Sequence, residues 1–347
     1  MALVRLRREL QTLFRAHGHE MNVYNLEAPT HREISELRET VIHDSNPLIE
    51  YELSLAATKR QRGVLMQTAC SAFRRKFTME QREVYTRVLD AVHLQKGGVF
   101  FLNAAGGTGK SFLLSTLLME IRAYGFVALA CATSGIADTL YPLGHTVHSA
   151  FKLPTDDNVL STAQTLFGPS DRRADLLRAA KLVIIDEAVM LRKEYLDLID
   201  RTMRDIEGNP DSTFGGRCVF VLAGDFRQVL PVIRKGKRAD QCASCLRYSA
   251  VWSSGVVQQL ALTQNMRAVT AGSHTDAEDI RLFSEYVLSI GDGARPPNSA
   301  EVHSVFGPGY VSIPEDIAMP IGSTIDNLLD WVYPDLPEHY SDRGWLM

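Results

Sequence analysis

The stretch Phe100-Phe-Leu-Asn-Ala-Ala-Gly-Gly-Thr-Gly-Lys-Ser111 decides the fold, because a glycine-rich turn joins an apolar run to a helix-forming segment, residues 112–124. Glycines let consecutive backbone N–H groups turn inward around phosphate oxygens, and the N-terminus of the next helix adds the positive end of its dipole. In this pattern the lysine reaches the β- and γ-phosphates and the following hydroxyl ligates Mg²⁺. The sequence therefore predicts a P-loop for a nucleoside triphosphate, with Lys110 and Ser111 in these roles.

The phosphate cradle is expected to comprise the turn and the first residues of the helix. It consists of Ala105, Gly106, Gly107, Thr108, Gly109, Lys110 and Ser111. The usual pattern begins with a glycine, but Ala104 stands at that position here. If the turn needs a positive φ there, alanine restricts it.

A second apolar run, residues 182–185, leads directly into Asp186 and Glu187. Paired acids at the end of a buried strand are typical of a Walker B motif. In that motif Asp186 holds Mg²⁺, directly or through water, and Glu187 orients and deprotonates the attacking water. A third run ends near Asp225 and Gln228, which we expect to support the Mg²⁺ shell and to sense the γ-phosphate.

Short apolar runs alternate with helical stretches from about residue 77 onward. These runs are residues 99–102, 127–131, 182–185, 219–222 and 256–262. They are continuous rather than alternating, as expected for strands that are buried on both faces. The order of strands and helices predicts an α/β fold with a parallel, doubly wound sheet, whose ligand lies beyond the carboxyl ends of the strands.

Composition and texture suggest three parts: a polar, helical extension (1–75), the α/β domain (76–268) and a looser, irregular segment (269–347). Apolar runs stay well short of the ~20 residues that a membrane-spanning helix needs. Five scattered cysteines argue against a secreted disulfide framework and favour a reducing, intracellular compartment. The net charge of −4 does not suggest nucleic-acid binding, although a motor needs only a local basic groove.

Several other motifs leave alternatives open. His145 and His148 suit either a metal pair or the packing of a binding track, and Cys242 and Cys245 have zinc-like spacing without a second pair. The basic run at 234–238 fits nuclear targeting, phosphate contact or a solvated loop. The basic N-terminus fits either an organelle-targeting peptide or, as we favour, a solvated helix.

Six segments in order resemble the motifs of the PIF-type (petite integration frequency) DNA helicases of superfamily one, especially the version fused into Helitron transposases. They are residues 77–85 (a Q motif), 106–111 (the P-loop), 133–141 with 144–151 (motif Ia), 185–188 (motif II), 224–232 (motif III) and 262–267. This resemblance implies ATP hydrolysis coupled to 5′→3′ stepping along single-stranded DNA, in recombination, repair and telomere maintenance. It also implies a RecA-like fold, with ATP bound between two such domains.

The resemblance also implies roles for single residues. Gln81 would read adenine, and Asp186 and Glu187 would be the metal ligand and the general base. Gln228 would be the γ-phosphate sensor, and Arg267 an arginine finger, which is typically worth ~10³–10⁵ in rate. The residues expected to line the DNA track are Ser134, Gly135, His148 and Phe151, because backbone contacts and aromatic stacking suit a motor that ignores sequence.

The resemblance covers the first motor domain and its trailing segment, and we expect the second motor domain to be absent from this chain. A truncated remnant that holds nucleotide or DNA without unwinding is therefore the alternative function. A small-molecule kinase is a third possibility, but it offers no use for motif III or for the segment around His148. The resemblance implies a nuclear location, with the mitochondrion as the alternative.

Overall fold

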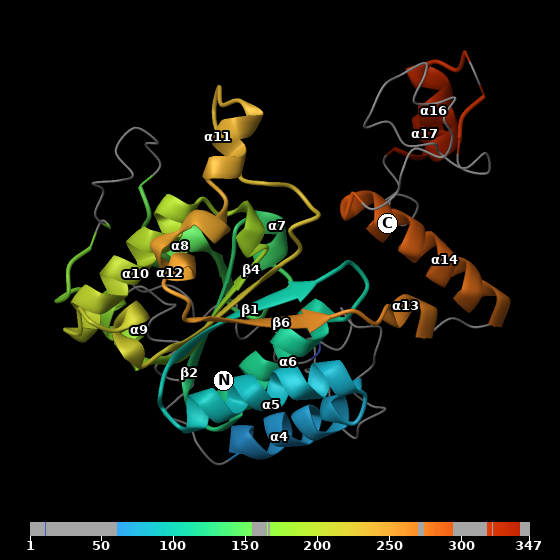
Figure 1. Ribbon diagram of the computed structural model, residues 1–347. Coiled ribbons are helices and arrows are strands. Elements are labelled where there is room, and N and C mark those ends of the chain that lie inside the picture. Colours follow the sequence, from blue (N-terminus) through green and yellow to red (C-terminus); the bar gives the residue numbers. More distant parts are fainter. Residues whose placement is uncertain are drawn as a thin grey trace. The chain divides into compact units, whose positions relative to one another are not determined.

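The computed structural model describes residues 11, 61–154, 165, 167–269, 274–293, 318–320 and 322–340. The chain divides into two compact units, residues 1–282 and 283–347, and the first contains the sheet (Figure 1). Of the predicted N-terminal extension, residues 1–75, only residue 11 and residues 61–75 are among the described residues.

A six-stranded parallel sheet forms the centre of the first unit, with the strand order β3-β2-β4-β5-β1-β6. The strands are β1 (Gly98–Ala104), β2 (Val127–Ala132), β3 (Gly144–Thr146), β4 (Ala180–Asp186), β5 (Val219–Gly224) and β6 (Val257–Leu262). The predicted α/β class and the parallel sheet are confirmed. All five predicted strands are present, and β3 is an additional, three-residue strand at one edge.

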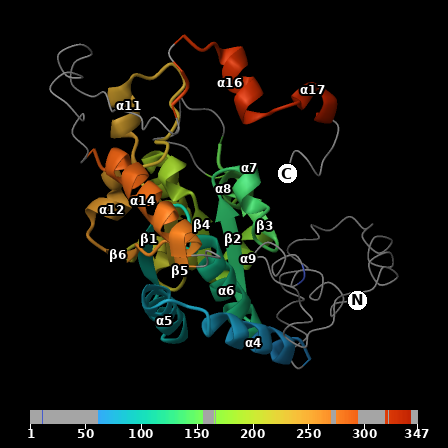
Figure 2. The ribbon, with the colours of Figure 1, turned by 90° about the vertical axis from the view of Figure 1, so that its right-hand side faces the viewer.

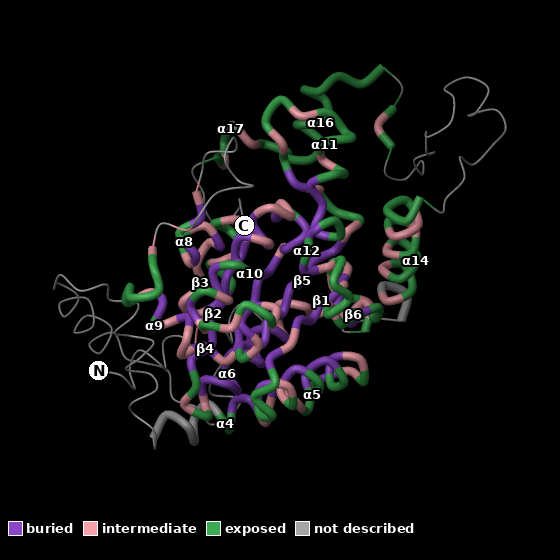
Figure 3. Tube along the Cα trace, turned by 60° about the vertical axis from the view of Figure 1, so that its left-hand side comes forward, coloured by how far each residue is buried: buried purple, intermediate pink, exposed green. Residues whose placement is uncertain are grey.

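Alternate residues of the central strands enter two different hydrophobic cores. In β1, Phe100 and Leu102 pack into the core shared with α5 and α6 (bounds below), whereas Val99 and Phe101 pack into the opposite core. The four central strands are buried along most of their length, as Figure 3 shows, whereas the edge strands β3 and β6 are not. Continuous apolar runs are thus required, because both faces of each central strand are covered.

Helices cover both faces of the sheet (Figures 1 and 2). On one face lie α4 (Gln61–Arg74), α5 (Met79–His93) and α6 (Lys110–Ala123). On the other face lie α8 (Val147–Phe151), α9 (Arg172–Ala179), α10 (Lys193–Glu207) and α12 (Ala250–Ser253). This is the doubly wound arrangement, which leaves the carboxyl ends of the strands open for a ligand.

The helix α4 packs against the P-loop helix, although the sequence placed it in a separate extension. Its Phe73 is fully buried and makes an edge-to-face contact with Phe112, with ring centroids 5.1 Å apart. The compact first unit includes α4 as well. The part of α4 around Phe73 is therefore packed into the α/β domain and is not only an appendage.

Short elements complete the first unit, α14 begins in that unit and ends in the second, and two short helices follow in the second. The short elements are α7 (Gly135–Asp138), η3 (Ala188–Met190), η4 (Thr213–Gly216), α11 (Arg238–Ala243), η5 (Leu246–Tyr248) and α13 (Met266–Val269). They are followed by α14 (His274–Gly291), α16 (Ile325–Val332) and α17 (Leu336–His339). The segment expected to be irregular is thus largely helical where it is described. Among the described residues, no helix is both long and apolar enough to cross a membrane.

Candidate nucleotide site

The P-loop runs from the end of β1 to the start of α6. Gly107 and Gly109 have φ values of 82° and 79°, in the region that glycine adopts most readily. Ala104 ends β1 without a positive φ. The alanine at the first position of the motif therefore restricts nothing, contrary to our expectation, because the glycine-dependent turns lie further along the loop.

The N-terminus of α6 is built to receive an anion. Gly109 is its N-cap residue, with a left-handed backbone and no side chain that caps the helix. The first N–H groups of a helix have no partner within the helix, and the dipole makes that end positive. An N-terminus without a side-chain cap at the carboxyl edge of a parallel sheet is suited to phosphate binding.

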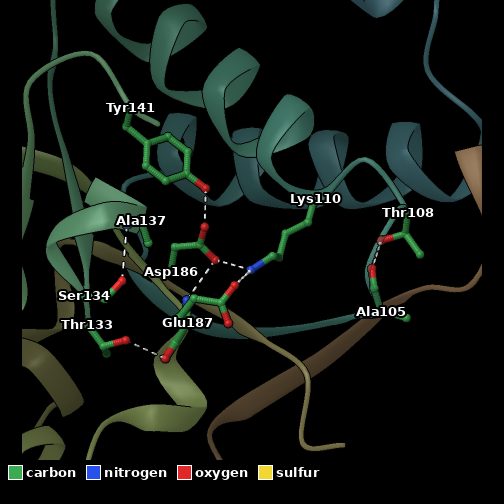
Figure 4. Close-up of polar contacts among 9 residues, drawn as sticks. All are labelled: Ala105, Thr108, Lys110, Thr133, Ser134, Ala137, Tyr141, Asp186 and Glu187. Carbon is green, nitrogen blue, oxygen red and sulfur yellow. Dashed lines mark hydrogen bonds and ion pairs between the residues drawn. The ribbon is translucent and has the colours of Figure 1, made fainter. Parts of the chain in front are cut away.

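Lys110 bridges the two acids of the Walker B motif (Figure 4). Its Nζ lies 2.5 Å from Asp186 Oδ1 and 2.6 Å from Glu187 Oε1. Burial lowers the pKa of the Lys110 ammonium, but the two carboxylates outweigh this effect, so the pKa lies above its usual value. The predicted phosphate-binding lysine, metal ligand and general base are thus brought into one cluster.

The Asp186 carboxylate has partners on both oxygens. Oδ1 also accepts the Glu187 backbone N–H at 2.8 Å, and Oδ2 accepts the Tyr141 hydroxyl at 2.5 Å. Glu187 itself has a left-handed backbone, with φ 51° and ψ 34°. Such strain in a non-glycine residue costs about 1–3 kcal/mol and is concentrated at functional sites.

The end of β2 is tied to the same acids. The Thr133 hydroxyl donates to the Glu187 carbonyl at 3.0 Å, and the Thr133 N–H donates to the Asp186 carbonyl at 3.3 Å. Tyr141 approaches from the far end of the segment that begins at Thr133 (Figure 4). Burial raises the pKa of the Tyr141 hydroxyl well above its usual value, and the Asp186 carboxylate raises it further. Sequence reasoning did not assign a role to either residue.

Gln81 braces the P-loop. Its Oε1 accepts the Thr78 N–H at 3.1 Å in a capping box at the start of α5, and its Nε2 donates to the Thr108 carbonyl at 3.0 Å. A Cβ on Gly109 would come within 2.5 Å of Nε2, so the two segments are in close contact. Gln81 is only 1% exposed. Its predicted contact with adenine stays a prediction.

The segment after β6 lies against the P-loop. The Met266 N–H donates to the Gly107 carbonyl at 2.8 Å, and Asn265 caps the short helix α13 by accepting the Arg267 N–H at 2.9 Å. A Cβ on Gly107 would meet the Arg267 Cδ at 3.5 Å. The structure thus brings the stem of Arg267, the predicted arginine finger, beside the phosphate cradle.

Asp225 and Gln228 follow β5, which lies between β1 and β4 in the sheet. Asp225 is buried and pairs with Arg227, with an N–O distance of 3.3 Å. Gln228 is exposed, and its N–H donates to the Asp225 carbonyl. Both residues lie at the carboxyl edge of the sheet, and their predicted roles at the phosphate stay predictions.

The residues predicted for the DNA track differ in accessibility. Ser134 caps α7 by accepting the Ala137 N–H, and Gly135 is exposed. His148 is partly exposed and contacts the Tyr195 ring edge-to-face. Phe151 is fully buried in the hydrophobic core, where a base cannot stack on it. We therefore leave Phe151 out of the proposed track.

The remaining motifs, the histidine pair, the cysteine pair and the basic run, are distant in sequence from the P-loop. His145 is on the edge strand β3, and burial lowers its pKa. Cys242 is exposed, whereas Cys245 is buried. The four basic side chains of the run at 234–238 are exposed. In the part of the chain that the structure describes, no group of three or more His, Cys, Asp or Glu residues is arranged to hold a metal ion.

The glycine turn, the N-terminus of α6 without a side-chain cap and the Lys110–Asp186–Glu187 cluster define a P-loop nucleoside triphosphatase domain. A family model described as "PIF1-like helicase" matches residues 76–301, which is more than half of the chain. The chain therefore belongs to the PIF1-like helicase family. The matched residues include the P-loop, both Walker B acids and α14 as far as Gly291.

Individual relatives agree with this assignment. The chain is 33% identical over 146 residues to the ATP-dependent DNA helicase Pif1 of Psychrobacter sp. (strain PRwf-1), covering 42% of this chain and 21% of that protein. It is 31% identical over 195 residues to the ATP-dependent DNA helicase RRM3 of Saccharomyces cerevisiae, covering 55% of this chain and 25% of that protein. The chain thus spans about a quarter or less of the length of these two relatives.

Solved Pif1 structures also resemble the chain. Unliganded Pif1 from Bacteroides sp. matches with a TM-score of 0.45 and 27% identity, over 55% of this chain and 42% of that one. A Bacteroides Pif1 bound to single-stranded DNA matches with a TM-score of 0.44 and 28% identity, over 55% of this chain and 42% of that one.

Proposed function

We propose that this chain is an ATP-hydrolysing motor domain of a DNA helicase that moves 5′→3′ along single-stranded DNA. The observation that carries the proposal is the pairing of Lys110 with both Asp186 and Glu187, 2.5 and 2.6 Å away. It gathers the groups that phosphate binding, metal binding and water activation need. The family supplies the substrate class, since its named relatives are ATP-dependent DNA helicases.

The residues present fit ATP with Mg²⁺. The turn at 105–109 and the N-terminus of α6 suit the phosphates, and Ser111 and Asp186 offer the oxygen ligands that Mg²⁺ prefers. When bound, Mg²⁺ would neutralise charge on the phosphates and polarise them. Lys110 then reaches the phosphates, which releases Glu187 from its ion pair.

Glu187 is the proposed general base. Its carboxylate accepts the proton of the attacking water. Its left-handed backbone sets the direction in which the side chain leaves the main chain. Gln228 orients that water or senses the γ-phosphate, and Arg267 stabilises the charge that develops there. Gln81, beside the P-loop, reads the adenine.

Single-stranded DNA is the proposed partner. Ser134, Gly135 and His148 lie on segments that follow β2 and β3 at the carboxyl edge of the sheet, and they would line its track. The exposed basic run at 234–238 adds positive charge after β5. A second motor domain, supplied by a parent chain, would close on the ATP and provide a further arginine finger.

The finer assignments rest on the resemblance of the sequence motifs. We propose that the chain is of the Helitron-associated subgroup and is a first motor domain. Its roles would be in recombination, repair and telomere maintenance. The corresponding location is the nucleus, with the mitochondrion as the alternative.

Phosphate release with and without oligothymidine tests the proposal. We expect Mg²⁺-dependent ATP hydrolysis that Glu187→Gln abolishes, and preferential unwinding of a 5′-tailed over a 3′-tailed duplex once a second motor domain is supplied. Binding of nucleotide and DNA without any hydrolysis would instead identify a binding remnant. If Lys110→Ala leaves nucleotide affinity unchanged, the P-loop assignment itself is wrong.

A further inference from the structure

Tyr141 contacts the Walker B acid that is predicted to hold Mg²⁺. Its hydroxyl donates to Asp186 Oδ2 at 2.5 Å. Tyr141 is only 3% exposed. One buried phenol thus orients a carboxylate that the sequence predicts as a metal ligand, although 45 residues separate the two in the chain.

The contact with Asp186 is independent of Lys110. Lys110 and the Glu187 N–H both bind Oδ1, whereas Tyr141 binds Oδ2. When Lys110 moves to the phosphates, as the proposed function requires, Tyr141 still holds the carboxylate in its orientation. The bond from Tyr141 thus does not depend on the ion pair with Lys110.

The backbone around Tyr141 is anchored to the P-loop helix. The Gly144 N–H donates to the Tyr141 carbonyl at 3.0 Å, which closes a tight turn. Arg122, a buried residue of α6, donates to the Pro142 carbonyl in that turn at 3.0 Å and to the Ala128 carbonyl in β2 at 2.9 Å. The helix that carries Ser111 therefore also fixes the position of the tyrosine.

We propose that Tyr141 is a positioning residue of the Mg²⁺ site, which holds the Asp186 carboxylate in the orientation that the ion needs. The inference rests on the proposed function, because it presupposes that the site binds Mg²⁺ with a nucleotide. Mg²⁺ demands nearly ideal octahedral geometry, so misaligned ligands weaken it strongly. Loss of a partner that orients a metal ligand typically lowers metal affinity about 10–100-fold.

The test is Tyr141→Phe in the full chain, with the binding of a fluorescent ADP analogue measured in EDTA and then as Mg²⁺ is titrated in. We expect unchanged nucleotide affinity in EDTA and an apparent Mg²⁺ affinity about tenfold weaker than in the wild type. Tyr195→Phe is the matched control, because it removes another largely buried hydroxyl, which donates to the Pro154 carbonyl at 3.1 Å. Its Mg²⁺ titration should equal that of the wild type.

Identical Mg²⁺ titrations for wild type and Tyr141→Phe would overturn the inference. A loss of affinity that is already complete in EDTA would also overturn it, since the tyrosine would then support the phosphate cradle. A wild type that binds no nucleotide at all would instead refute the proposed function. Thermal unfolding checks that the variant is folded. If it is not, Tyr141→Met, which has a more adaptable side chain and no donor, replaces it under the same criteria.

Discussion

Replacing Lys110 by methionine should destabilise the protein even when no nucleotide is present. The Lys110 ammonium pairs with both Asp186 and Glu187, whose side chains are 2% and 24% exposed. Methionine keeps most of the apolar stem and removes only the charge. The Asp186 carboxylate then loses its cation in a site that water barely reaches.

The size of the effect follows from this burial. Removing one partner of a fully buried ion pair costs about 3–5 kcal/mol, whereas an exposed pair contributes less than about 1 kcal/mol. Here Glu187 can be hydrated in part, and Asp186 keeps its bonds from Tyr141 and from the Glu187 N–H. We therefore expect Lys110→Met to lower the free energy of unfolding by about 2–3 kcal/mol.

Urea unfolding in EDTA, followed by circular dichroism, measures this loss. The double variant Lys110→Met/Asp186→Asn should regain part of it, because no uncompensated charge is left at the most buried position. Lys96→Met is the control, since Lys96 is exposed and its replacement should change stability by less than about 0.5 kcal/mol. If Lys110→Met is as stable as Lys96→Met, the ion pair does not stabilise the nucleotide-free protein and the reasoning is refuted.

Three further changes test other parts of the site. Glu187→Gln should slow ATP hydrolysis about 10²–10⁴-fold in a phosphate-release assay while nucleotide binding persists; unchanged turnover would exclude it as the base. Burial raises the pKa of Glu80, but hydrogen bonds from Thr263 and its neighbour lower it more, to below its usual 4.5. Glu80→Gln should therefore cost about 1 kcal/mol at pH 7, and the difference should vanish as the pH falls through the lowered pKa; a gap that persists in acid would contradict this. Gly109→Ala combines a positive φ with a Cβ 2.5 Å from Gln81 Nε2, so equilibrium binding should show weaker nucleotide affinity; normal affinity would contradict the geometry.

The P-loop and the Walker B acids could be predicted from the sequence because each is a contiguous motif. A glycine turn between a strand and a helix fixes its own local geometry, and acids that follow a buried strand must emerge at its carboxyl end. Two such motifs in a parallel sheet therefore face the same edge, which brings Lys110 and Asp186 to one site.

The supporting contacts could not be predicted in this way. Tyr141 is 45 residues from Asp186 in the chain, and Gln81 is 27 residues from Thr108. Each contact depends on how separate elements pack, and a tyrosine in a loop looks the same whether it fills the core or holds a carboxylate. Phe151 illustrates the opposite error, because a phenylalanine near a binding motif suggests base stacking until its burial is known.

The contacts around α7 link the two halves of the proposed function. Thr133 precedes this helix and Tyr141 follows it, and both residues bind the Walker B segment, one through the Glu187 carbonyl and one through the Asp186 carboxylate. Between Thr133 and Tyr141 lie Gly135, which belongs to the proposed DNA track, and Ile136, which is 84% exposed. Because both ends of α7 are fixed to the acids, a shift of this helix upon DNA binding has to move Asp186 and Glu187 or break their hydrogen bonds. The proposed DNA track and the proposed site of hydrolysis are therefore linked through the hydrogen bonds of Thr133 and Tyr141.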